Sequence, residues 1–118
     1  MTIDELKQMS LDALEDLKAE DITVLDVRGK TTVTDWIIVA TGSSSRHVKS
    51  IANSVITAAK KANKVPLGSE GEDDGEWVLV DLGDVIVHIM QRQVREYYDL
   101  ESLWSVDAVE QRREQDNA

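Results

Sequence analysis

The chain has 118 residues with 13 basic and 23 acidic side chains, a formal net charge of −10 and no cysteine. This length is enough for one hydrophobic core and one domain, while the missing cysteines exclude disulfides and thiolate metal sites and fit a reducing compartment. The negative charge argues against direct binding of nucleic acid, which needs a basic surface, and suits a basic protein partner.

No stretch of the sequence combines a basic start with the continuous apolar run of a secretory signal. No stretch reaches the apolar length of a membrane span either. We therefore expect a cytoplasmic protein that is neither exported nor inserted into a membrane.

The N-terminal part predicts one helix followed by two strands. Thr2 and Glu5 have the spacing of a capping box, and apolar residues at helical spacing continue to about residue 20. Residues 21–29 (DITVLDVRG) and 34–42 (TDWIIVATG) are rich in β-branched residues and end in glycine. The second run is almost wholly apolar, which is typical of a central strand.

The remaining chain predicts a second helix over residues 46–64 after a serine cap, then a short edge strand at VPLG and a loop over residues 69–76. A hairpin follows over residues 76–91, then one or two short helices over residues 92–104. This order predicts a single α/β domain, residues 1–104, with a mixed β-sheet and helices packed on it. Residues 105–118 are too polar to pack and are predicted to be a flexible tail.

The hairpin EWVLVDLGDVIVHIMQ has two faces of different composition. Gly83 and Asp84 suit a two-residue turn, because a glycine at the first position tolerates the positive φ that this turn requires. One face is then wholly aliphatic and faces the core. Since side chains alternate along a strand, the other face carries Trp77, Leu79, Asp81, Ile86, His88 and Met90.

Two interpretations of this second face are open. In the first, the protein's own helices cover it, with His88 hydrogen-bonded inside and Trp77 as ordinary filling of the core. In the second, it is an exposed docking surface, because tryptophan and methionine are enriched at the centres of interfaces and a wholly internal layer does not normally hold both Asp81 and His88. The acidic loop that leads into Trp77 would then rim the surface with negative charge.

A turn of Gly42, Ser43, Ser44 and Ser45, called the serine turn here, precedes the second helix and could bind a phosphate at the free amides of that helix. The same residues also suit an ordinary strand-to-helix turn and cap. A glycine-serine start is also found in nucleotidyltransferases, but the carboxylate pair that would hold their metal ions is missing after the turn.

The sequence favours no catalytic, metal or cofactor site. Only His47 and His88 could join carboxylates around zinc, and no ligand spacing indicates such a site. A Ser-His-Asp set can be assembled from the serine turn, His47 and Asp35, but without a strained nucleophile turn. The acids of residues 70–76 do not match a calcium loop. We therefore predict a protein that is not an enzyme and has no cofactor.

Three blocks of the sequence resemble one known family. TDWIIVATGSSSRHVKSIA, PLGSEGEDDGEWVLVDLGDVIVHIM and YYDLESLW are similar in order and spacing to the ribosomal silencing factors, also called the Iojap family. The resemblance runs from about Asp21 to Trp104. It implies a nucleotidyltransferase-like core that lacks catalytic carboxylates.

The resemblance also implies a function and a site. Family members repress translation when nutrients are short, by binding ribosomal protein L-fourteen on the large ribosomal subunit and blocking its association with the small subunit. The resemblance further suggests that the protein forms a homodimer in isolation. Trp77 and Met90 are the residues most expected to contact the partner directly. The full set of expected partner-binding residues is Trp77, Leu79, Asp81, His88, Met90, Tyr98, Leu100 and Trp104. The alternative from the residues alone is a nucleotide-binding or degenerate nucleotidyltransferase-like protein that uses the serine turn.

Overall fold

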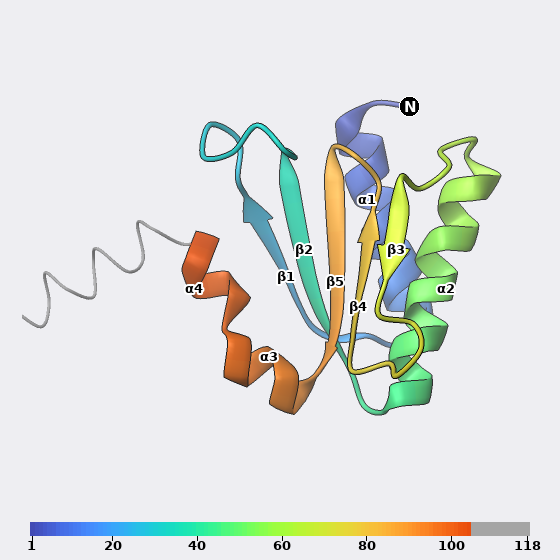
Figure 1. Cartoon of the computed structure of the whole chain (residues 1–118). Coiled ribbons are helices and arrows are strands. Elements are labelled where there is room, and N and C mark those ends of the chain that lie inside the picture. Colours follow the sequence, from blue (N-terminus) through green and yellow to red (C-terminus); the bar gives the residue numbers. More distant parts are fainter. Residues whose placement is uncertain (105–118) are drawn as a thin grey trace, which may run out of the picture.

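A five-stranded mixed sheet forms the centre of this computed structural model, which describes residues 1–104 (Figure 1). The strands lie in the order β1-β2-β5-β4-β3, and β2 and β5 are parallel while the other neighbours are antiparallel. Their bounds are β1 (Glu20–Asp26), β2 (Trp36–Gly42), β3 (Gly68–Glu70), β4 (Trp77–Asp81) and β5 (Val85–Gln91). The predicted α/β class with a mixed sheet is confirmed. The tail predicted for residues 105–118 lies outside the described residues.

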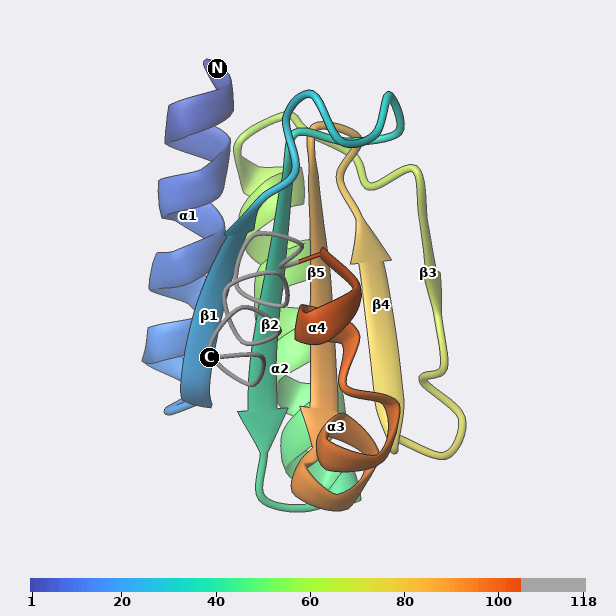
Figure 2. The ribbon, with the colours of Figure 1, turned by 90° about the vertical axis from the view of Figure 1, so that its left-hand side faces the viewer.

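Two long helices, α1 (Ile3–Asp16) and α2 (Ser45–Lys61), cover one face of the sheet (Figure 2). The predicted capping box is present, with the Glu5 amide donating to Thr2 Oγ1 at 3.1 Å and the Thr2 amide donating to Glu5 Oε1 at 3.3 Å. Helix α1 ends at Asp16, earlier than the expected residue 20, because Lys18 adopts a left-handed φ of 59° and the chain turns into β1.

The main core lies between this face of the sheet and α1–α2. The aliphatic face of the hairpin is fully buried there, as predicted, against the apolar stripes of the two helices. Burial of each such side chain contributes about 1.5–3 kcal/mol. The hairpin residues in this core are Val78, Val80, Leu82, Val85, Val87 and Ile89.

The hairpin has the predicted turn and register. Gly83 adopts a φ of 89°, Val80 lies opposite Val87, and the Leu82 amide donates to the Val85 carbonyl at 2.9 Å. Because side chains alternate along the strands, this register places Trp77 opposite Met90 on the second face of the sheet.

The edge strand after the single proline is displaced from its expected position. Strand β3 begins at Gly68, the last residue of VPLG, and continues through Ser69 and Glu70, which were expected in a loop. Only the backbone after Pro66 can pair continuously, because proline has no amide to donate. The Leu67 amide donates to the Asp81 carbonyl at 2.8 Å and starts this pairing.

Two short helices, α3 (Arg92–Tyr98) and α4 (Leu100–Trp104), lie on the second face of the sheet, opposite α1 and α2 (Figure 2). Asp99 joins them in a left-handed conformation with a φ of 46°. Within residues 1–104, no helix has the length and apolar character needed to cross a bilayer.

Candidate functional site

The second face of the sheet carries aromatic side chains that remain partly accessible. Trp77 on β4 is half-buried, and its ring lies 4.9 Å from the ring of Tyr98 on α3. Tyr97 packs edge-on against Tyr98 with ring centroids 5.0 Å apart. Tyr97 and Tyr98 are 80% and 58% exposed. We call Trp77, Tyr97 and Tyr98 the aromatic cluster, and it gives the molecule an apolar surface that its own helices leave open.

His88 lies beneath Trp77 and fixes its orientation. The Trp77 indole Nε1 donates to His88 Nδ1 at 2.9 Å, so the proton of the neutral imidazole must be on Nε2. His88 is only 7% exposed, and burial lowers its pKa to about 4. The imidazole is therefore neutral at pH 7 and accepts the indole hydrogen bond. His88 thus positions neighbours from below, which the sequence had left open as an alternative.

Met90 is 0% exposed and lies in a second, smaller core with Val27, Ile37 and Val39. The half-buried Leu100 and Trp104 pack over this core from α4. Met90 was expected to contact the partner directly, and this expectation is corrected because the side chain is buried. Its thioether instead supports the surface from beneath. Leu100 and Trp104 close the C-terminal helices onto the sheet.

Leu79 and Asp81 are half-buried on the same face, farther along β4. Asp81 Oδ1 accepts a hydrogen bond from the Gly83 amide at 2.8 Å, so its carboxylate stabilises the hairpin turn. Of the eight expected partner-binding residues, the structure brings Trp77, His88, Met90, Tyr98, Leu100 and Trp104 together through the contacts above.

The acidic loop before Trp77 is fixed to α2. Ser45 Oγ donates to the Asp74 carbonyl at 2.7 Å, and Lys49 Nζ donates to the Asp73 carbonyl at 2.9 Å. The side chains of Glu72, Asp73, Asp74 and Glu76 remain exposed. This arrangement fixes the acidic loop, which leads into Trp77, through one serine hydroxyl and one lysine of α2.

Arg95 on α3 is a site residue that sequence reasoning missed. It is 9% exposed and donates hydrogen bonds to groups on β1, β2 and α4. An arginine within the polar segment RQVREYY resembles any solvated residue. The only signal was its position three residues before Tyr98 on the predicted helix, which is too weak to identify burial.

The serine turn uses its hydroxyl groups within the protein. Ser44 Oγ accepts from the His47 amide at 3.1 Å, and Ser45 Oγ donates to Asp74. Ser43 Oγ lies 3.1 Å from His47 Nδ1, and the other ring nitrogen, Nε2, lies 2.7 Å from the Leu17 carbonyl. His47 therefore links this turn to the end of α1. Among residues 1–104, no group of three or more His, Asp or Glu side chains could hold a metal ion.

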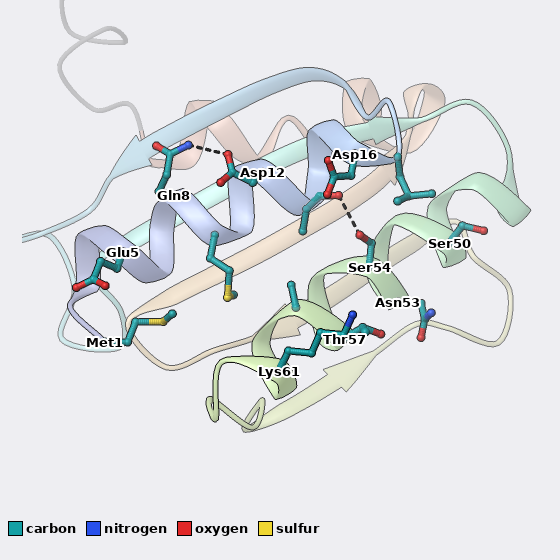
Figure 3. A pocket seen from close by; sticks show the side chains of 14 residues that line it. Met1, Glu5, Gln8, Asp12, Asp16, Ser50, Asn53, Ser54, Thr57 and Lys61 are labelled. Carbon is teal, nitrogen blue, oxygen red and sulfur yellow. Dashed lines mark hydrogen bonds between the residues drawn. The ribbon is translucent and has the colours of Figure 1, made fainter.

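An open groove of about 800 Å³ lies between α1 and α2 (Figure 3). Met9 and Ala13 on α1 and Leu17 at its C-terminal cap line it, with Ser54 and Ala58 on α2. Helices α1 and α2 lie on the opposite side of the sheet from α3, which carries Tyr97 and Tyr98 (Figure 2). The groove is thus separate from the surface described above.

Comparisons with known proteins give a consistent result. The family model described as ribosomal silencing factor during starvation matches residues 1–118. The ribosomal silencing factors of Chromobacterium violaceum and Haemophilus influenzae are 51% and 48% identical to this chain, over 88% and 85% of its length and 85% and 98% of theirs. A mouse protein named mitochondrial assembly of ribosomal large subunit protein 1 is 32% identical over 83% of this chain and 44% of its own. A crystal structure of a Chromobacterium violaceum protein, 51% identical, superposes with a TM-score of 0.87 over 88% of this chain and 87% of that one.

Proposed function

The chain belongs to the ribosomal silencing factor family, and we propose that it represses translation by binding ribosomal protein L-fourteen on the large ribosomal subunit. Family membership gives it a ribosome-associated role in silencing translation. The proposal adds that the bound protein occupies space needed by the small subunit, so that the subunits cannot join when nutrients are short. It acts in the cytoplasm and catalyses no reaction.

One observation carries the proposal. The aromatic cluster remains open beside the part of the sheet face that α3 and α4 cover. Trp77 is held rigidly by its hydrogen bond to His88, and Tyr98 packs against it from α3. Rigid aromatic side chains bury a large area on binding at a small entropic cost, which suits the centre of an interface. The exposed acids of the adjacent loop form a rim that favours a basic partner surface.

Inhibition by steric exclusion needs only binding energy. A standard interface buries roughly 800 Å² on each partner, which one sheet face with its rim can supply. The name of the mouse relative refers to the assembly of the ribosomal large subunit, which supports that subunit as the partner. The nucleotidyltransferase-like core that the family resemblance implies belongs to the same proposal. Such a core lacks the catalytic carboxylates, so binding is the only activity left to it.

The aromatic cluster also offers a surface for a homodimer in the absence of ribosomes. Exposed apolar side chains gathered on one face are a common cause of self-association. Dimer formation through this cluster would compete with docking on the large subunit. The fraction of dimer should therefore fall when large subunits are added.

The test is a pelleting titration of the protein with purified large subunits. Truncation of a central tryptophan typically costs about 2 kcal/mol or more, so Trp77→Ala should weaken binding by about thirtyfold or more. The matched control is Trp36→Ala, which removes a half-buried tryptophan from the opposite face of the same sheet, where the ring contacts Lys7 and Arg28. Equal binding of wild type and Trp77→Ala would show that the docking face is elsewhere.

A further inference from the structure

Helices α3 and α4 together form an arm, residues 92–104, that lies across the second face of the sheet (Figure 2). The arm has little apolar anchorage of its own. Arg95 is the buried residue of α3, and α4 contains no buried residue. Val94, Leu100 and Trp104 pack only partly buried against the smaller core. Polar contacts must therefore contribute to the position of the arm.

The Arg95 guanidinium supplies those contacts with all five of its N–H groups. Nε donates to Glu101 Oε1 at 2.9 Å, and one Nη2 hydrogen goes to Glu101 Oε2 at 3.3 Å. The other Nη2 hydrogen goes to Thr23 Oγ1 on β1 at 2.9 Å. Nη1 donates to Thr41 Oγ1 on β2 at 2.9 Å and to the Asp21 carbonyl. One side chain therefore connects α3 with two strands and with α4.

This geometry requires an arginine. Its planar fork reaches several acceptors at fixed angles, whereas a lysine presents one nitrogen and cannot span both strands and Glu101. The pair with Glu101, whose side chain is 30% exposed, fixes α4 relative to α3 across the left-handed Asp99. A buried charge is stable only when its hydrogen bonds are satisfied, and here every donor is used.

We infer that Arg95 is the positioning residue that assembles the docking face. By holding the first helix of the arm against β1 and β2, Arg95 sets Tyr98 against Trp77 and closes Leu100 and Trp104 over Met90. Without it, Trp77 would remain on the sheet but the tyrosine half of the aromatic cluster would not be held beside it. This inference rests on the proposed function and adds the residue on which the shape of the docking face depends.

If Arg95 served only the overall stability of the fold, its loss would affect the whole domain and not the arm in particular. The main core is built from α1, α2 and the strands, and within residues 1–104 it includes no side chain of the arm. The arm can therefore detach while the sheet and its two long helices stay folded. A seven-residue helix is unstable in isolation, so a detached α3 should lose its protection from hydrogen exchange.

The experiment compares the full chain with three Arg95-related variants and one control. Arg95→Met removes the hydrogen bonds and keeps much of the apolar stem, Arg95→Lys keeps the charge, and Glu101→Gln weakens one partner only. The control is Arg92→Met on the same helix, because Arg92 pairs with the exposed carboxylates of Glu20 and Asp21. Each protein is measured by hydrogen exchange and by pelleting with purified large subunits.

We expect Arg95→Met to raise exchange over residues 92–104, to leave α1 and α2 protected, and to weaken binding by about tenfold or more. Arg95→Lys should fall between Arg95→Met and wild type. Glu101→Gln should weaken binding by about threefold, in line with one weakened charge-assisted hydrogen bond. Arg92→Met should change neither measurement, because exposed ion pairs contribute little.

The outcomes separate the two proposals. Should Arg95→Met release the arm and still bind like wild type, the inference is overturned while the proposed function stands. Should wild type itself fail to pellet with large subunits, both are overturned. If Arg95→Met raises exchange throughout the chain, Glu101→Gln decides the question, and unchanged exchange together with unchanged binding in that variant overturns the inference.

Discussion

The neutral state of His88 makes a quantitative prediction for the dependence of stability on pH. Burial lowers the His88 pKa from 6.5 to about 4 in the folded protein. In the unfolded chain the imidazole takes up a proton as the pH falls through 6.5, whereas the folded protein resists protonation until about pH 4. The contribution of His88 to stability is therefore fully present above pH 6.5 and is lost progressively as the pH falls towards 4.

The size of the effect follows from the two pKa values. One pKa unit corresponds to about 1.4 kcal/mol, so the full loss is about 3 kcal/mol, and about 2 kcal/mol of it should be lost between pH 7.5 and pH 5. Protonation of Nδ1 would also remove the acceptor for the Trp77 indole, so the orientation of that ring depends on the same proton.

The assay is urea unfolding of wild type and His88→Asn at several pH values. Asparagine has a carbonyl oxygen close to the position of Nδ1 and does not titrate, so subtraction of the two curves removes the contribution of the many carboxylates. The cost of the smaller side chain is independent of pH and cancels from the slope. We expect the difference in unfolding free energy to fall by about 2 kcal/mol from pH 7.5 to pH 5. A flat difference would refute the assignment of a buried neutral imidazole.

Three further predictions concern other parts of the fold. Gly71→Ala should lower the free energy of unfolding by more than about 1 kcal/mol in thermal denaturation, because Gly71 has a φ of 93° and an added Cβ would lie 1.9 Å from the Trp77 carbonyl oxygen. Thr2→Ala should cost about 1 kcal/mol through loss of the helix cap and leave large-subunit binding unchanged. Nucleotides with divalent metals should not raise the melting temperature, and a clear rise would favour the nucleotide-binding alternative at the serine turn.

The sequence was sufficient to predict features that depend on local pattern. The register of the hairpin followed from the alternation of Val78, Val80 and Leu82 and from the glycine at position 83, and both are present in the structure. The capping box at Thr2 was equally local. These features could be predicted because each is encoded within a few residues.

Features that depend on distant contacts were not predicted. Arg95 bonds to Thr23 and Thr41, which are 72 and 54 residues away, and no local pattern indicates such a partner. Burial of Met90 depends on where the arm lies, which the amphipathic pattern of such short helices does not determine. For the same reason, alternation alone assigned Met90 to the correct face of the sheet but could not decide whether the arm covers it.

Subunit joining tests the central claim most directly. Purified large and small subunits are mixed with increasing concentrations of wild type or Trp77→Ala, and joined ribosomes are separated from free subunits on a sucrose gradient. Steric exclusion predicts that the joined fraction falls as wild type saturates the large subunits, and that Trp77→Ala needs a much higher concentration for the same effect. An unchanged joined fraction at a concentration where wild type fully occupies the large subunits would contradict the account.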